Sequence, residues 1–136
     1  MAIGLSVGDK YYSIGGTDFF HSFFSTISYY LEPDGWGTKY PLLTQDLYRG
    51  KLECEKSKEV RMNLSEIKDL LSVFPPNKVI WDIDDLSQRP PWGDDIASDI
   101  TNLSNYFVTD DGKDLFEVLE SAIEYSIKNQ IDIWVE

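Results

Sequence analysis

The chain is poor in the residues that most redox centres and transition-metal sites require. It holds one cysteine, Cys54, and one histidine, His21, among 136 residues. A single cysteine excludes an intrachain disulfide, a CxxC redox motif and a zinc site built from several thiolates. A single histidine removes most histidine-based metal sites and catalytic triads. We interpret Cys54 as a small, half-buried hydrophobic residue and His21 as a surface or hydrogen-bonded residue.

Long apolar runs are also absent. No stretch approaches the roughly 18 consecutive apolar residues that span a bilayer. The first ten residues, MAIGLSVGDK, lack the basic region and long apolar region of a signal peptide. We therefore expect a soluble cytoplasmic protein with no membrane partner.

Positive charge is scarce, above all in the second half of the chain. The formal net charge is -12, and the isoelectric point is about 4.3. Residues 1–77 carry a net charge of -2, whereas residues 78–136 hold 14 acidic and 4 basic side chains. This balance argues against nucleic acid and anionic membranes as direct ligands. It suits a basic protein partner, although acids that only coat solvated helix faces give the same composition.

The hydrophobic and aromatic content is sufficient for a packed core in a single domain of residues 1–136. Apolar spacing and turn residues predict helices at 18–31, 63–74, 98–104 (or from 95) and 113–128. They predict strands at 2–7, 11–14, 79–81, 106–108 and 131–135. Residues 51–61 fit an edge strand, with a solvated helix as the alternative. The economical arrangement is an α+β fold, in which three to four helices pack on a single mixed sheet. Because helices separate the later strands, α/β is the alternative.

The most distinctive stretch is VIWDIDDLSQRPPWGDDI, residues 79–96, which we call the acidic loop. Its apolar start predicts a buried strand, and Pro90-Pro91 stiffens the acidic and aromatic residues that follow. Such a segment is suited to bind another protein. Trp92 either anchors that partner or folds back onto its own domain. Of the other tryptophans, Trp81 and Trp134 are expected in the core, and we favour Trp36 as a loop anchor over an exposed binding aromatic.

Catalytic interpretations of the acidic loop are weaker. The run from Asp82 to Asp85 resembles an aspartyl phosphotransferase motif, but Leu86 follows it and it lies past mid-chain. A calcium or magnesium cluster would use Asp82, Asp84, Asp85, Asp94 and Asp95, yet no twelve-residue calcium loop is present. Glycine-rich phosphate loops, GxSxG and HExxH are absent. We predict no catalytic residues, no metal and no cofactor. A metal-binding or hydrolytic domain using the Asp82–Asp95 carboxylates stays open as an alternative, as does a non-catalytic adaptor.

Several stretches together resemble the bacterial immunity protein 70 family of polymorphic toxin systems. They are Ser6-Val7-Gly8, residues 18–27 (DFFHSFFSTI), residues 79–83 (VIWDI), residues 90–93 (PPWG) and residues 100–109 (ITNLSNYFVT). The resemblance implies that the chain neutralises a cognate toxin by binding it, and it carries over no catalytic residues. Toxins that cut nucleic acids have basic clefts, which an acidic surface can occupy. The residues expected to contact the toxin are Asp84, Asp85, Trp92, Asp94 and Asp95.

Overall fold

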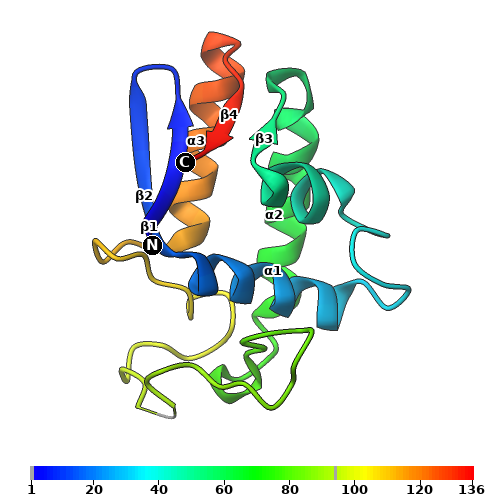
Figure 1. Ribbon diagram of the computed structural model, residues 1–136, viewed down its shortest axis with the longest axis vertical. Coiled ribbons are helices and arrows are strands. Elements are labelled where there is room, and N and C mark those ends of the chain that lie inside the picture. Colours follow the sequence, from blue (N-terminus) through cyan, green and yellow to red (C-terminus); the bar gives the residue numbers. More distant parts are fainter. Residues whose placement is uncertain (1, 94) are drawn as a thin grey trace.

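Four short strands form one sheet in the order β2-β1-β4-β3 (Figure 1). The computed structural model describes residues 2–93 and 95–136. The strands are β1 Ala2–Val7, β2 Lys10–Gly16, β3 Lys51–Leu52 and β4 Ile133–Val135. Each neighbouring pair in this sheet is antiparallel. The predicted α+β class and the single sheet with helices packed on it are confirmed. The sheet of the described residues is antiparallel and not mixed as expected, because no helix connects two parallel neighbours in it.

Three α-helices of 15 residues each accompany the sheet: α1 Thr17–Leu31, α2 Ser57–Leu71 and α3 Leu115–Asn129. The shorter helical turns are η1 Leu42–Leu47, η2 Cys54–Lys56 and η3 Pro76–Lys78. In Figure 1, α3 lies behind β1 and β4 with α2 beside it. Helix α1 crosses below them, between the sheet and the long irregular chain that joins α2 to α3.

Helix α1 lies at the centre of the hydrophobic core. Phe23, Phe24 and Ile27 are fully buried. The Phe23 ring meets Phe116 of α3 edge-on at 5.3 Å between centroids, and it meets Phe107 of the irregular chain at 5.2 Å. Such edge-on pairs add to the stabilisation from burial alone. Helix α1 therefore joins the sheet-and-helix part of the molecule to the irregular chain.

One face of the sheet is open to solvent. Tyr11, Ser6, Trp134 and Lys51 are cross-strand neighbours in one row across the four strands. Trp134 is 47% exposed, and the Lys51 ammonium lies 4.7 Å from its ring centroid. The expectation that Trp134 is in the core is wrong, because alternation along β4 turns Ile133 inward and Trp134 outward.

The central third of the chain differs most from the predicted elements. The helix expected at 63–74 begins at Ser57 and ends at Leu71, because its apolar stripe starts earlier, at Val60. Residues 79–81 and 95–104 are irregular, so the strand and the short helix predicted there are wrong. The strand predicted at 106–108 is reduced to an isolated bridge between Val108 and Asp114.

Among the described residues, no helix is both long enough and apolar enough to cross a bilayer.

Candidate functional site

The start of the acidic loop runs along α1, where helix hydroxyl groups take the place of strand partners. Ser22 and Thr26 donate hydrogen bonds to the Ile80 carbonyl at 2.8 and 3.2 Å. The Thr26 hydroxyl also accepts the Ile80 N–H at 3.1 Å, and Ser25 accepts the Ile83 N–H at 3.2 Å. Because these hydroxyls satisfy the backbone of an apolar segment, the segment is held without pairing into the sheet.

The far end of the irregular chain is held by buried side chains. Leu103 and Phe107 are fully buried, and the Leu103 N–H donates to the Phe74 carbonyl at 3.0 Å. The Phe74 ring in turn stacks on Tyr30 of α1 at 4.4 Å between centroids. The irregular chain that contains the acidic loop is therefore held on both sides of this loop by residues packed on α1.

His21 joins three segments through a chain of hydrogen bonds. Its Nδ1 lies 2.7 Å from the Tyr48 hydroxyl, and its Nε2 lies 3.1 Å from Asp82 Oδ1. A neutral imidazole fits both contacts when Tyr48 donates to Nδ1 and Nε2–H donates to Asp82. Asp82 Oδ1 also accepts the Asp84 N–H at 2.9 Å. His21 thus connects α1 to the chain after η1 and to the acidic loop.

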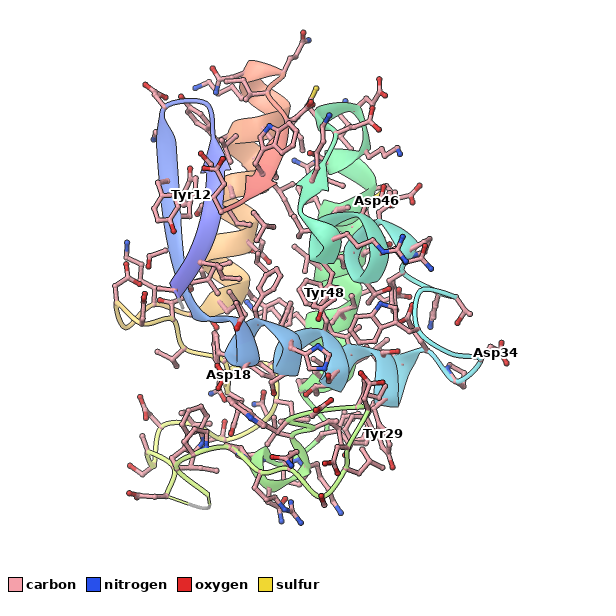
Figure 2. All side chains as sticks on the ribbon, in the orientation of Figure 1. Tyr12, Asp18, Tyr29, Asp34, Asp46 and Tyr48 are labelled. Atoms are coloured by element: carbon pink, nitrogen blue, oxygen red, sulfur yellow. The ribbon has the colours of Figure 1, made fainter. Side chains whose placement is uncertain are left out.

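A pocket of about 310 Å³ opens beside this hydrogen-bond chain, lined by His21, Trp36, Tyr48, Ile83 and Asp84. We call it the histidine pocket. Figure 2 shows Tyr48 between η1 and α1, on the side of the molecule that faces the viewer. The Trp36 ring stacks on His21 at 5.9 Å and meets Tyr48 nearly edge-on at 5.1 Å. Its indole N–H donates to the Thr44 carbonyl at 2.5 Å. Trp36 is therefore a half-buried loop anchor, as we favoured, and also a wall of the pocket.

A buried carboxylate holds the loop that carries Trp36. Glu32, at the end of α1, is only 2% exposed. Its oxygens accept the backbone N–H groups of Gly37, Lys39 and Tyr40 at 2.9 to 3.1 Å, and the Thr44 hydroxyl at 3.3 Å. Hydrogen bonds to an ionised acceptor are roughly twice as strong as neutral ones. This wall of the histidine pocket is therefore formed in the free protein.

Although the order hydroxyl, imidazole, carboxylate is that of a catalytic triad, the hydroxyl is not activated. Burial, then the charges of Asp84 and Asp82, raises the pKa of Tyr48 above its ordinary value of 10.0. A nucleophile needs the opposite shift or a stronger base. At neutral pH Tyr48 keeps its proton and serves as a hydrogen-bond donor.

The Asp85 carboxylate forms hydrogen bonds within its own turn. It accepts hydrogen bonds from the Ser87 hydroxyl, the Ser87 N–H and the Gln88 side chain at 2.6 to 3.1 Å. These bonds, led by the Ser87 hydroxyl, hold the pKa of Asp85 below its ordinary value. Asp85 is therefore ionised and exposed, but its oxygens already have partners.

Trp92 both packs on its own domain and faces solvent. Its indole N–H donates to the Tyr106 hydroxyl at 2.8 Å, and its ring meets Trp81 edge-on at 5.4 Å. It is still 41% exposed. Trp81, expected in the core, is half-buried beneath it. Burial raises the pKa of the Tyr106 hydroxyl above its ordinary value, so the acceptor for Trp92 stays neutral.

A second pocket, of about 210 Å³, lies beside Trp92 and is otherwise lined mainly by apolar residues: Phe19, Ile96, Ala97, Ile100, Tyr106, Val108 and Asp95. We call it the tryptophan pocket. Phe19 in this pocket and His21 in the other lie two residues apart on α1.

The predicted contact residues are therefore divided between two pockets on one helix. Asp84 lines the histidine pocket, and Trp92 and Asp95 line the tryptophan pocket. Asp85 is exposed and lines neither. Asp94 lies outside the described residues.

Two carboxylates of the acidic loop are grouped with a histidine, which differs from the five-aspartate cluster considered as an alternative. One potential ligand atom from each of His21, Asp82 and Asp84 lies within 4.8 Å of the other two. Among the described residues, Asp85 and Asp95 do not belong to this group. A metal ion here would have to displace the hydrogen bond between His21 and Asp82.

Sequence reasoning missed His21, Trp36 and Tyr48 as site residues. For His21, the sequence does offer a signal. The neighbouring hydroxyl residues Ser22, Ser25 and Thr26 form a stripe that is buried on a helix whose other sides are apolar. Such a stripe indicates that another segment covers the helix there. No local pattern marks Trp36 and Tyr48, which the buried Glu32 and the π-helical turn η1 bring to α1.

No curated protein and no solved structure matches the chain at a significant level. The family model described as Immunity protein 70 matches residues 5–135, nearly the whole chain. The match spans α1, the acidic loop and both pockets, in agreement with the resemblance that the sequence carries. The chain belongs to the immunity protein 70 family.

Proposed function

We propose that this chain neutralises a cognate toxin in the cytoplasm by binding it through the acidic loop and the two pockets beside it, without catalysis. The observation that carries the proposal is membership of an immunity protein family. The exposed carboxylates of the acidic loop add a physical route to binding.

Three carboxylates of the acidic loop, those of Asp84, Asp85 and Asp95, form no ion pair with a described residue. Among the described residues, ion pairs of lysine involve Asp46, Glu53, Asp111 and Asp132. No lysine or arginine pairs with Asp84, Asp85 or Asp95 in that part of the chain. A basic partner would thus meet unpaired negative charge, which favours correct orientation and fast association.

Trp92 has the properties of an interface anchor. It is large and partly exposed, and its hydrogen bond to Tyr106 fixes its orientation before a partner arrives. Tryptophans held in this way lose little conformational freedom on binding and often dominate interface energetics. An apolar side chain of the toxin would fit the tryptophan pocket next to it.

The proposal is tested by binding to the cognate toxin domain, which we expect an adjacent gene to encode. We expect the variant with Asp84, Asp85, Asp94 and Asp95 changed to Asn to bind about a hundredfold more weakly. This follows if each carboxylate contributes about 0.7 kcal/mol, within the range for exposed ion pairs. Isothermal titration calorimetry measures both affinities.

The matched control changes four exposed acids on helices α2 and α3 to their amides: Glu59, Asp69, Glu117 and Glu124. It alters the net charge equally but leaves the acidic loop intact, so its affinity should stay within about threefold of wild type. Equal weakening of both variants would remove the acidic loop from the mechanism. Failure of the wild-type chain to bind the toxin domain at all would overturn the proposed function.

A further inference from the structure

We propose that the histidine pocket receives an arginine side chain of the toxin. The source of the arginine rests on the proposed function, whereas the chemistry of the pocket rests on its own residues. The pocket combines aromatic walls with one uncommitted carboxylate, which is the combination that recognises a planar cation.

The walls of the pocket are aromatic and fixed in place. Trp36, Tyr48 and His21 contact one another at ring-centroid distances of 5.1 to 5.9 Å. The Trp36 indole N–H and the Tyr48 hydroxyl are both hydrogen-bonded. Tryptophan and tyrosine faces attract cations, and arginine is the usual partner because its guanidinium also stacks on rings.

Asp84 supplies the charge. It is exposed, lines the pocket, and its carboxylate accepts no hydrogen bond and forms no ion pair with a described residue. Asp82, by contrast, already accepts hydrogen bonds from His21 and from the Asp84 backbone. No lysine or arginine lines the pocket. One negative charge beside aromatic walls is therefore left for a cation from outside.

A metal ion is the competing occupant, and the geometry favours arginine. Both His21 nitrogens have partners, so a metal must break the contact with Asp82 or Tyr48 before it gains a ligand. An arginine side chain can enter a pocket of about 310 Å³ without breaking either contact. The guanidinium would pair with the Asp84 carboxylate and pack against the aromatic rings that line the pocket.

The experiment uses N-acetyl-arginine amide as the probe, with N-acetyl-citrulline amide as its uncharged counterpart of the same shape. NMR follows the Trp36 indole N–H and the His21 ring signals during titration of the full chain. We expect saturable shifts at both residues with the arginine probe and none with the citrulline probe. Shifts that are equal for the two probes, or that spread over the whole surface, would overturn the proposal.

Two neighbouring substitutions separate the pocket from general charge. Asp84→Asn should weaken binding of the arginine probe about fivefold, the upper range for one exposed ion pair. Asp85→Asn removes the same charge one residue away, outside the pocket, and should change the affinity by less than about twofold. Equal effects of the two variants would show that only net charge matters.

A zinc titration examines the competing occupant directly. Micromolar binding of zinc that is lost in His21→Asn would reassign the pocket to a metal and overturn the proposal, whereas absence of such binding supports arginine. These results on the isolated chain are independent of toxin binding. If the arginine probe binds but the toxin domain does not, the pocket assignment stands and the proposed function fails. If the toxin domain binds but the arginine probe does not, the proposed function stands and the pocket assignment fails.

Discussion

Thr26 uses one hydroxyl group to hold the backbone of a segment 54 residues away in the chain. Its oxygen donates to the Ile80 carbonyl and accepts the Ile80 N–H, and the side chain is fully buried. Valine has the same shape without the hydroxyl. It would leave the N–H of Ile80 without this partner, and an unsatisfied buried group of this kind costs about 1–3 kcal/mol.

We therefore expect Thr26→Val to lower the free energy of unfolding by about 1–3 kcal/mol, measured by urea denaturation. Thr17→Val, at the exposed start of the same helix, is the matched control and should stay within about 0.5 kcal/mol of wild type. If both variants unfold at the same urea concentration, the hydroxyl bonds do not hold the acidic loop.

Glu32, like Thr26, holds a backbone segment through hydrogen bonds to its buried side chain, in this case a carboxylate. Four donors from the loop that follows α1 converge on one buried carboxylate. A buried charge is tolerated only when such hydrogen bonds replace its hydration. The position of Trp36, and with it one wall of the histidine pocket, depends on this acid, although Glu32 does not itself line the pocket.

At the scale of elements, local patterns predicted the two ends of the chain well. Apolar residues between glycine turns predicted β1 and β2, and alternation predicted β4. The aromatic stripe predicted α1 within one residue of its observed start. These elements are decided by residues within a few positions of one another, so sequence periodicity suffices.

The middle of the chain could not be predicted in this way. The apolar run Val79-Ile80-Trp81 has the composition of a strand, but its hydrogen-bond partners are hydroxyl groups of α1. The Asn63–Glu66 pattern has the spacing of a capping box, yet it lies inside α2. In the site, Asp84 could be predicted because charge marks it as exposed, whereas Trp36 and Tyr48 depend on long-range packing that a local pattern does not encode.

The start of α3 carries a carboxylate whose environment works against ionisation. Asp114 is the N-cap residue, and its Oδ1 is buried with no hydrogen-bond partner among the described residues. Burial raises the pKa of Asp114, and the nearby Lys68 opposes this only in part. Because the folded-state pKa lies above the unfolded-state value, stability is lost as the pH rises through the folded-state pKa.

We therefore expect Asp114→Asn to raise the melting temperature by a few degrees at pH 7, since the Asp114 side chain makes no capping hydrogen bond and asparagine has no charge to bury. The gain should shrink towards pH 3, where wild-type Asp114 is protonated. Thermal unfolding followed by circular dichroism at several pH values measures both effects. A gain that is the same at pH 3 and pH 7 would show that ionisation of Asp114 is not its cause.

Asp111, three residues before Asp114, provides a control because its pKa is shifted in the opposite direction. A hydrogen bond from Thr109, and to a lesser extent Lys113, lowers the pKa of Asp111. Its contribution is therefore present above the unfolded-state pKa and is lost as the pH falls through the folded-state pKa. Asp111→Asn should lower the melting temperature at pH 7, and the difference should shrink in acid.

At the scale of the whole molecule, the proposed function assigns long-range attraction to the net charge and recognition at contact to the packed side chains of the two pockets. The net charge of -12 gives a field that draws in any basic protein. This field does not select a site, because acids also cover α2 and α3. Under the proposed function, selection would fall to the few carboxylates and aromatics of the two pockets beside α1, because charges at the contact are the least screened.

This division predicts how salt affects toxin binding. The Debye length is about 8 Å at physiological ionic strength, so only charges near the contact steer a partner there. We expect the wild-type association rate constant to fall about tenfold or more between roughly 50 and 500 mM salt, with a much smaller change in dissociation. Surface plasmon resonance with the toxin domain measures both rate constants.

Two variants test where the steering charge lies. The variant with Asp84, Asp85, Asp94 and Asp95 changed to Asn should lose most of this salt dependence. The variant with Glu59, Asp69, Glu117 and Glu124 changed to their amides should keep it, because the two differ only in where the charge was removed. Identical salt slopes for these variants would mean that the total charge steers the toxin and that the acidic loop gives no direction to the encounter.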